Sequence, residues 1–279
     1  MGYAFRIVNV FTVDDDRLSG NPLCVFEDAR GLSAAQMLAL ARQMNLSETT
    51  FVLPSESADA RVRIFTPGFE MPFAGHPTLG TAHVVGGTRG EVTLEVQAGV
   101  VPVRRSGRAW TLRTAKAPTT RPVEATRTEL ARMLGLADDA VSAEPLWVDT
   151  GVEQLVIPIA TPELVASARP VPTLLERWGY STRRDEAMAY LFAPGDPAWT
   201  VRFFFTSHGA VIEDPATGSA CANLGGWWLA TGGALPHRAT LRQGDAVGRP
   251  SRLGLEVTAE RDILVTGDVI ELGRGVIEL

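Results

Sequence analysis

Four polar residues stand where apolar segments of the chain break into turns, and their side chains are of the kinds that move protons or hold anions. Glu48 precedes an apolar, β-branched segment, His76 opens a segment of small residues, and Asp214 and Ser219 flank a glycine turn. A carboxylic acid shielded from water has a raised pKa, so it can both accept and return a proton near neutral pH. Glu48 fits that task best.

Each of these residues also has a purely structural interpretation. Glu48 could end a strand in solvent or cap a helix, and His76 could be a hydrogen-bonded residue at a helix start. Asp214 could cap the following helix, which is compatible with binding a ligand. Ser219 does not predict a hydrolase, because its neighbours lack the glycines of the Gly-x-Ser-x-Gly nucleophile elbow.

The elements that must position these residues can be predicted from propensity and pattern. Strands are expected at residues 61–65 and 200–205, and a helix over 34–44 that Ser33 caps and Asn45 ends. Further helices are expected from His76 and over residues 220–230, with Asp214, Thr217 and Ser219 as candidate caps. The start of a helix offers unpaired N–H groups and a positive dipole end, which suit a carboxylate or phosphate.

These elements repeat. In each half an aromatic strand is followed by a loop with an acid and by a glycine turn that enters a small-residue helix, at Gly75-His76 and at Gly218-Ser219. Single glycines mark turns far more often than ligands, so the paired context carries the inference. Two such halves, packed about a pseudo-twofold axis, would set two helix starts against one cleft and hold a small anion.

Composition limits the classes of function. The chain has 279 residues, an apolar fraction of 45% and a net charge of 26 − 32 = −6. We therefore expect a folded cytoplasmic protein with no nucleic-acid partner, no membrane partner and no signal peptide. Cys24 and Cys221 are expected to be core residues rather than a disulfide framework. Lys116, the single lysine, lies in a polar Pro/Thr-rich stretch that does not suit imine chemistry.

A metal site is not expected. His76 and His83 lie seven residues apart, whereas paired ligands on a helix normally lie three or four apart, and no cysteine or third histidine joins them. His208 and His237 carry no pattern. Residues 117–126 are dense in Pro and Thr and predict a linker. We place one domain at residues 1–118, completed by about 266–279, and the second at 119–265.

The order of these motifs resembles the phenazine biosynthesis PhzF-like family over nearly the entire chain. The segments that carry the resemblance are Gly20-Asn21-Pro22, Ser47-Glu48-Thr49-Thr50-Phe51, Gly75-His76-Pro77-Thr78 and Glu213-Asp214-Pro215-Ala216-Thr217-Gly218-Ser219-Ala220, with Gln243-Gly244 near the end. The resemblance implies an α+β fold of two diaminopimelate epimerase-like domains, each a curled mixed sheet around a central helix. It also implies an interdomain active site and a homodimer.

Carried onto this sequence, the resemblance implies that Glu48, His76 and Asp214 are catalytic. It further implies that Asn21 and Ser219 bind substrate, and that backbone N–H groups around Gly75 and Gly218 bind a carboxylate. Neither cysteine occupies the turn that starts a cleft-facing helix, which disfavours the two-thiol mechanism of related racemases.

The expected activity is therefore that of an isomerase without metal or cofactor, acting on a small carboxylate. The resemblance points to the isomerisation of trans-2,3-dihydro-3-hydroxyanthranilate in phenazine biosynthesis. An epimerase or racemase of an amino-acid derivative is one alternative. The other is a non-catalytic carboxylate-binding protein that kept the cleft, since fold does not fix function.

Overall fold

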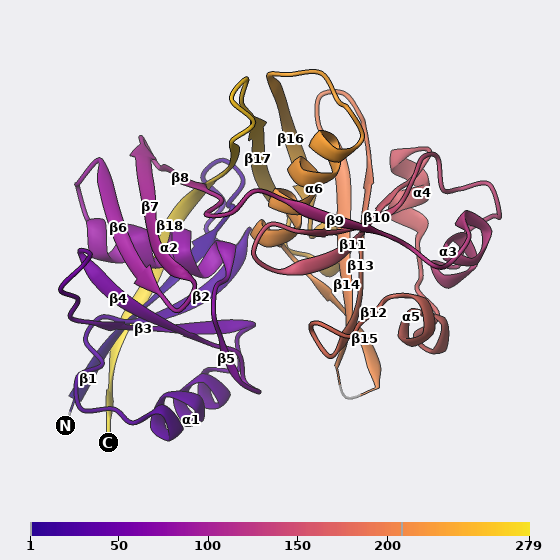
Figure 1. The fold of residues 1–279 in the computed structure, drawn as a ribbon. Coiled ribbons are helices and arrows are strands. Elements are labelled where there is room, and N and C mark those ends of the chain that lie inside the picture. Colours follow the sequence, from indigo (N-terminus) through magenta and orange to yellow (C-terminus); the bar gives the residue numbers. More distant parts are fainter. Residues whose placement is uncertain (1, 208) are drawn as a thin grey trace. The chain divides into compact units, whose positions relative to one another are not determined.

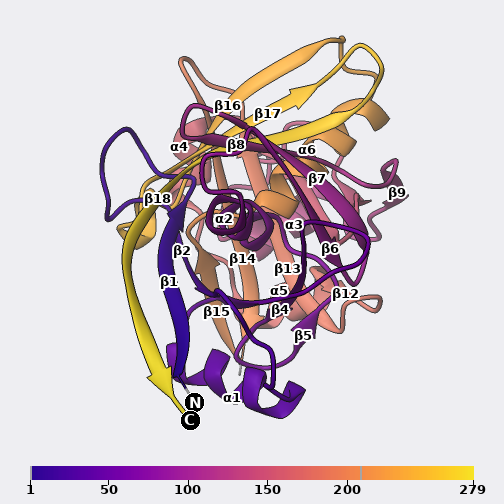
Figure 2. The ribbon, with the colours of Figure 1, turned by 90° about the vertical axis from the view of Figure 1, so that its left-hand side faces the viewer.

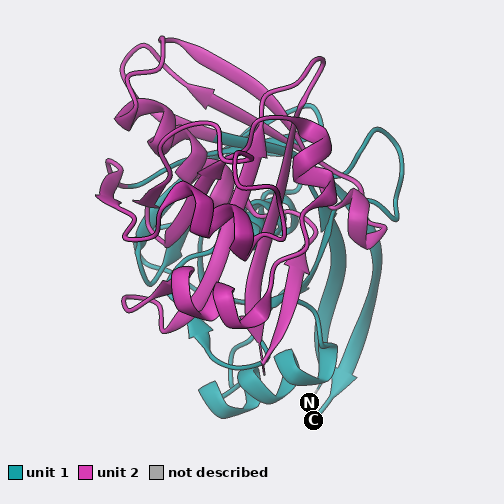
Figure 3. Ribbon diagram, turned by 90° about the vertical axis from the view of Figure 1, so that its right-hand side faces the viewer, with its two compact units in different colours: residues 1–115, 265–279 teal, residues 116–264 magenta. Residues whose placement is uncertain are grey.

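The computed structural model describes residues 2–207 and 209–279, which divide into two compact units (Figure 3). Unit 1 comprises Met1–Ala115 and Val265–Leu279, and unit 2 comprises Lys116–Leu264. His208, for which the sequence predicts no role, lies outside the described residues. No helix in the described part of the chain is long and apolar enough to cross a membrane.

Unit 1 is built from nine strands and two helices among its described residues. Its helices are α1 (Ala34–Met44) and α2 (Gly75–Gly86). Its strands are β1 (Gly2–Val10), β2 (Asn21–Phe26), β3 (Glu48–Leu53), β4 (Ala60–Phe65), β5 (Glu70–Met71), β6 (Glu91–Val96), β7 (Gly99–Ser106), β8 (Ala109–Arg113) and most of β18 (Ile263–Glu278).

The sheet of unit 1 is mixed. β2 pairs with β3 in parallel, β3 with β4 antiparallel, β4 with β6 in parallel, and β6 with β7 antiparallel. β1 pairs antiparallel with both β2 and β18. Figure 2 shows α2 end-on, with the strands of unit 1 curled around it. A helix can be enclosed in this way because the segment Gly75–Gly86 contains no Asp, Glu, Lys or Arg.

Gly80 allows α2 to lie this close to the sheet. A Cβ atom at this position would lie 2.6 Å from Leu23 Cδ2 and 3.0 Å from Val10 Cγ2. Both distances are shorter than normal carbon contacts. Any larger residue at position 80 would therefore push the helix away from β1 and β2.

The first helix confirms the prediction from its sequence. Ser33 caps α1 in a capping box with Gln36, and Asn45 ends the helix in the left-handed conformation. α1 packs against β3 and β4 (Figure 1). Beneath it the Phe26 and Phe51 rings stack with centroids 4.9 Å apart, and Phe65 meets Phe51 edge-on. This aromatic cluster fixes β2 and β3 on their outer face.

Unit 2 has four α-helices and a single short 3-10 helix, η1 (Asp245–Val247), among its described residues. The α-helices are α3 (Arg127–Met133), α4 (Pro162–Ser167), α5 (Pro172–Trp178) and α6 (Gly218–Ala230). The strands are β9 (Thr119–Pro122), β10 (Leu146–Asp149), β11 (Glu153–Pro158), β12 (Tyr180–Ser181), β13 (Glu186–Ala193), β14 (Trp199–Ser207), β15 (Ala210–Asp214), β16 (His237–Gln243) and β17 (Ser251–Val257).

Unit 2 repeats the pairing order of unit 1. β11 pairs with β13 in parallel, β13 with β14 antiparallel, β14 with β16 in parallel, and β16 with β17 antiparallel. α6 contains no charged residue, and β9, β10, β11 and β17 contact it. The shorter helices α4 and α5 pack against β13 and β14 (Figure 1). The chain is therefore of the α+β class, with a mixed sheet around a buried helix in each unit.

The repeat extends to matched ion pairs. In unit 1, Arg63 on β4 makes a bidentate pair with Glu70 on β5, with N···O distances of 2.7 and 2.5 Å. In unit 2, Arg202 on β14 makes the same pair with Glu213 on β15, at 2.9 and 2.6 Å. In both units this pair joins the strand before the acidic turn to the segment that leads into the central helix.

One prediction from the sequence is wrong in detail. The expected linker at 117–126 contains β9, because its β-branched Thr residues pair antiparallel with β10. Residues 161–178 contain the two short helices α4 and α5. Pro170 and Pro172 lie at the break between them, and a proline interrupts helical hydrogen bonding.

Candidate active site

The predicted residues of unit 1 meet at one edge of its sheet. Asn21 is the first residue of β2 and Glu48 the first residue of β3. Because β2 and β3 are parallel, both begin at the same edge. α2 contacts both strands, and it begins at Gly75 with His76 as its second residue. The fold thus brings Asn21, Glu48 and His76 together.

Glu48 and His76 are neighbours with little exposure to water. The Nε2 atom of His76 lies 3.6 Å from Oε2 of Glu48, and their side chains are 5% and 16% exposed. Water therefore reaches the Glu48 carboxylate only in part. An acid in such a position can exchange a proton with a bound molecule while most solvent is kept away.

Asn21 lies beside the His76 ring and favours one of its tautomers. Ser47 donates a hydrogen bond of 3.2 Å to Oδ1 of Asn21, and the Asn21 Nδ2 atom lies 3.5 Å from His76 Nδ1. An amide nitrogen can only donate, so Nδ1 of a neutral His76 accepts and its proton lies on Nε2. The Nε2–H group is then the one that faces Glu48.

Gly20 shapes the turn that brings the chain into Asn21. Its φ is +78°, and a Cβ atom there would lie 2.5 Å from the carbonyl oxygen of Val10. A residue with a side chain would be strained in this conformation and would clash with the strand backbone. The glycine of the Gly20-Asn21-Pro22 motif is therefore needed to place Asn21.

The predicted residues of unit 2 meet at the start of α6. β15 ends at Asp214, α6 begins at Gly218, and Ser219 is its second residue. Gly218 is buried and Ser219 is partly exposed. The first N–H groups of a 13-residue helix have no partner within the helix and lie at its positive end. This start can therefore bind an anion.

A short chain of hydrogen bonds orients Asp214. The backbone N–H of Thr217 donates to Oε1 of Gln243 at 3.2 Å, and the Nε2 group of Gln243 donates to the Thr217 hydroxyl at 3.0 Å. The Thr217 hydroxyl in turn donates to Oδ2 of Asp214. Thr217 is the N-cap residue, one of the candidate caps, but its side chain makes no capping bond; its oxygen instead accepts from Gln243 and its hydrogen is donated to Asp214.

Sequence reasoning missed two buried amides that support Ser219. Gln154 on β11 donates to the Ser219 hydroxyl oxygen at 3.0 Å, and Asn223 on α6 donates to Gln154 at 2.8 Å. Both amide residues are at most 2% exposed. Asn223 interrupts an otherwise apolar helix, and that isolated amide is the signal that could have identified it, whereas Gln154 directly follows Glu153 and carries no such signal.

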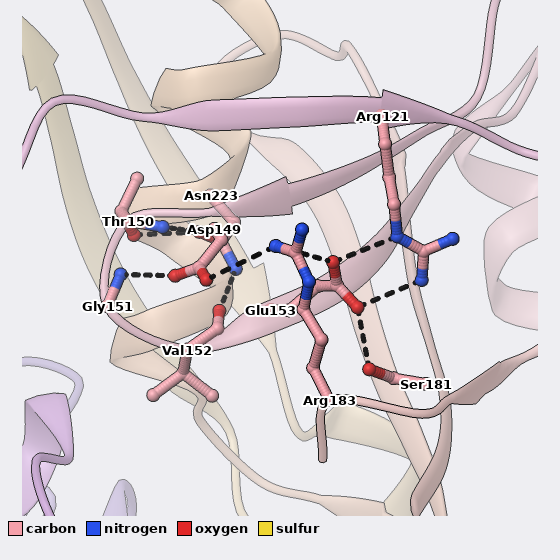
Figure 4. Close-up of polar contacts among 9 residues, drawn as sticks. All are labelled: Arg121, Asp149, Thr150, Gly151, Val152, Glu153, Ser181, Arg183 and Asn223. Atoms are coloured by element: carbon pink, nitrogen blue, oxygen red, sulfur yellow. Dashed lines mark hydrogen bonds and ion pairs between the residues drawn. The ribbon is translucent and has the colours of Figure 1, made fainter.

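A buried ion pair fixes the start of β11 beside Gln154. The Glu153 carboxylate is 2% exposed and accepts two hydrogen bonds from Arg121 and one from Ser181, while Arg183 lies 3.3 Å away (Figure 4). Burial alone would raise the pKa of Glu153, but the hydrogen bonds from Arg121 and Ser181 outweigh it and lower that pKa below its usual value. Glu153 is therefore ionised at neutral pH.

The remaining candidate side chains serve packing. Cys24 and Cys221 are fully buried, and burial raises the pKa of the Cys24 thiol to about 12 and that of Cys221 further. His83 accepts a hydrogen bond from the Trp110 indole at 3.3 Å, and burial lowers its pKa. In residues 2–207 and 209–279, no group of three His, Cys, Asp or Glu side chains is placed to hold a metal ion.

Comparison with known proteins agrees with this fold. Residues 8–274 match the family model of the phenazine biosynthesis-like proteins. A structure of a PhzF-family phenazine biosynthesis protein from Bacillus anthracis superposes with a TM-score of 0.86, at 24% identity and with 100% of both chains covered.

Two curated relatives are named as isomerases. An uncharacterized isomerase of Pasteurella multocida is 37% identical over 98% of this chain and 93% of its own length. The trans-2,3-dihydro-3-hydroxyanthranilate isomerase of Pseudomonas chlororaphis is 35% identical over 94% of this chain and 95% of its own. The chain therefore belongs to the phenazine biosynthesis-like PhzF family, and it is an isomerase.

Proposed function

We propose that this protein is a cofactor-independent isomerase that moves a proton between two carbon atoms of a small carboxylate similar to trans-2,3-dihydro-3-hydroxyanthranilate. The observation that carries the proposal is the Glu48 carboxylate, 16% exposed and 3.6 Å from His76 at the start of a buried helix. The name of the Pseudomonas chlororaphis relative supports the substrate class.

In the proposed reaction Glu48 both removes and returns the proton. One Glu48 oxygen takes a proton from a substrate carbon, so a C–H bond breaks, an O–H bond forms, and the electron pair enters the adjacent π system. The O–H bond then breaks as the proton is delivered to a second carbon. The enol-type product relaxes to its ketone by losing its O–H proton to water and gaining a proton from water at carbon, which is the step that introduces one deuterium in heavy water. No oxidant or reductant is needed, because the step is a net isomerisation.

The other site residues hold the substrate for this transfer. The Nε2–H group of His76 donates to a substrate oxygen or to Glu48 itself, and Asp214 accepts from the donor group of the substrate. Backbone N–H groups at Gly75 and Gly218, together with Ser219 and Asn21, bind the carboxylate and its neighbouring groups. The start of a helix favours a carboxylate there because of its dipole and its unpaired donors.

The test is turnover in heavy water. We expect trans-2,3-dihydro-3-hydroxyanthranilate to give an isomer with one deuterium bound to carbon, together with a changed absorption spectrum, and we expect dialysis against a chelator to leave the rate unchanged. Loss of optical rotation without a change in chromophore would select an epimerase instead. Tight binding of small carboxylates with no turnover would select a binding protein.

The proposal includes a homodimer, which rests on the family resemblance, and a cytoplasmic location, which rests on the sequence pattern. Sedimentation equilibrium tests the oligomeric state, and a mass equal to one chain at micromolar concentration would contradict a dimer. Cell fractionation tests the location.

A further inference from the structure

We propose that Gln154 and Asn223 are positioning residues that direct the hydroxyl hydrogen of Ser219 toward a bound acceptor, and so make this end of the site selective for a carboxylate. The inference rests on the proposed function, in which Ser219 contacts the substrate carboxylate. Asn223, Gln154 and Ser219 are called the amide relay below. All three residues lie in unit 2.

The orientation of the Asn223 amide is fixed at both ends by backbone groups. Its Oδ1 atom accepts from the Thr150 N–H at 2.9 Å and from the Thr150 hydroxyl at 2.7 Å, and its Nδ2 atom donates to the Val152 carbonyl at 2.8 Å (Figure 4). A backbone N–H can only donate and a backbone carbonyl can only accept. The oxygen and nitrogen of Asn223 therefore cannot exchange places.

This fixed amide determines the direction of the next two hydrogen bonds. The Nδ2 group of Asn223 donates to Oε1 of Gln154 at 2.8 Å, so the amide nitrogen of Gln154 must lie on the opposite side. That nitrogen lies 3.0 Å from the Ser219 hydroxyl oxygen and can only donate to it. Ser219 is therefore an acceptor toward Gln154.

A hydroxyl that accepts from a fixed donor must point its own hydrogen elsewhere. Ser219 is partly exposed at the start of α6, so its hydrogen can reach an incoming group. The hydroxyl then adds one more donor to the N–H groups of the first helical turn. A ligand that presents only oxygen acceptors, such as a carboxylate, satisfies these donors, whereas one that presents an N–H group there leaves a donor unpaired.

The fixed direction of the Gln154–Ser219 hydrogen bond distinguishes it from a hydrogen bond that only joins a strand to a helix. A bond made only for stability would work equally well with Ser219 as the donor. Because the amide relay ends on the backbone of Thr150 and Val152, the Ser219 hydroxyl can only accept from Gln154, and its own hydrogen is left for another acceptor. The amide relay thus predicts that the site prefers a carboxylate over a carboxamide of the same shape. A hydrogen bond that only stabilised the fold would predict no such preference.

The experiment compares two ligands of nearly equal shape, anthranilate and anthranilamide, by calorimetry on the full chain. In Gln154→Glu both side-chain oxygens are acceptors, so Ser219 must donate to residue 154 and offer its lone pairs to the ligand. We expect this variant to weaken anthranilate binding by at least about tenfold, and to change anthranilamide binding by less than about threefold. Gln154→Met, which removes the direction without adding charge, should weaken anthranilate binding by an intermediate factor.

A cycle with Ser219→Ala separates the relay from a direct effect of residue 154. Because the relay acts through the Ser219 hydroxyl, Gln154→Met in the Ser219→Ala background should change anthranilate binding by less than about twofold. Far-ultraviolet circular dichroism and a thermal melt of each variant verify that the fold is kept.

Three results would overturn the inference. Gln154→Glu could weaken both ligands equally, or Gln154→Met could have the same effect with and without the Ser219 hydroxyl. Alternatively, the wild-type protein could fail to bind anthranilate. Failure of the relay alone leaves deuterium incorporation by the wild-type protein intact, whereas failure of the proposed function shows as no incorporation in any variant.

Discussion

The starts of α2 and α6 have the same arrangement of strand and helix but carry different side chains. In both, a side-chain amide on a neighbouring strand bonds the second helical residue, Asn21 to His76 in unit 1 and Gln154 to Ser219 in unit 2. The start of α2 adds a carboxylate at 3.6 Å from its histidine. The start of α6 adds further amides, whose direction the backbone fixes.

This difference in side chains indicates that the two helix starts have different roles. Histidine and glutamate side chains can act as proton acceptors and donors in catalysis, whereas the side-chain amides of glutamine and asparagine serve as hydrogen-bonding groups. In unit 2 burial raises the pKa of Glu186, the first residue of β13, but its carboxylate is paired with Arg184 at 2.7 Å, whereas Glu48 faces His76. We therefore assign proton transfer to the start of α2, and binding and orientation to the start of α6.

The largest effect among the supporting residues is expected at His76. His76→Asn keeps a polar side chain but removes the Nε2–H group that faces Glu48, so kcat should fall by about 100-fold with a small change in KM. Ser219→Ala at the other helix start should instead raise KM and change kcat little. Steady-state kinetics of both variants separates the two roles. Equal effects of both variants on kcat would contradict the assignment of proton transfer to the start of α2 and of binding to the start of α6.

A moderate effect is expected at Gln243. Gln243→Leu removes the donor to Thr217 and the acceptor for its backbone N–H, so Asp214 loses its fixed orientation. The loss of one such oriented contact should lower kcat/KM by about tenfold. The conservative variant Thr217→Ser keeps the hydroxyl that donates to Asp214 and should retain most of the activity. If Gln243→Leu turned over normally, the orientation of Asp214 would not matter.

Stability should depend on the buried ion pair beside Gln154. Arg121→Met leaves the Glu153 carboxylate, 2% exposed, with fewer donors, so the free energy of unfolding should fall by about 2 kcal/mol. The matched control is Arg238→Met, which breaks a pair whose arginine is 76% exposed and should cost less than about 0.5 kcal/mol. Urea denaturation measures both values.

The same pair predicts a pH dependence. The pKa of Glu153 is lower in the folded protein than in the unfolded chain, so its stabilising contribution is present above the unfolded pKa and is lost as pH falls through the folded one. The difference in unfolding free energy between the wild type and Arg121→Met should therefore narrow as the pH falls below about 4.3, the ordinary pKa of a glutamate. A difference that stays constant would show that Glu153 does not carry the effect.

The smallest effect is expected at the thiols. Cys24 and Cys221 are fully buried with raised pKa values, so neither should react with a thiol reagent at pH 8 until the protein unfolds. Replacing both by Ala should leave deuterium incorporation nearly unchanged. Rapid labelling of the native protein, with loss of turnover, would contradict this prediction and support a two-thiol mechanism.

Features set by local sequence were predictable. The capping box of α1, its Asn45 terminus, the strand that starts at Glu48 and the two buried helices each depend on residues close together in the chain. The repeat of an aromatic strand, an acidic loop and a glycine turn was also predictable, because each copy is a pattern of residues close together in the chain. The positions of the catalytic and binding residues stay predictions until variants are assayed.

Features set by distant partners were not predictable. β9 forms because β10, more than twenty residues later, pairs with it, and its Pro/Thr composition alone favours a linker. The amide relay joins residues on β11 and α6 that are 69 positions apart. Propensity contains no information about such partners, and the only local signal is Asn223, a single amide within an otherwise apolar helix.

The most direct test of the central claim is Glu48→Gln in heavy water. This nearly isosteric change removes the group that takes the proton and keeps the shape of the site. We predict that deuterium incorporation into trans-2,3-dihydro-3-hydroxyanthranilate falls by at least about 100-fold, while the Kd for anthranilate changes by less than about threefold. Incorporation at the wild-type rate would remove Glu48 from the mechanism and contradict the assignment of proton transfer to the start of α2.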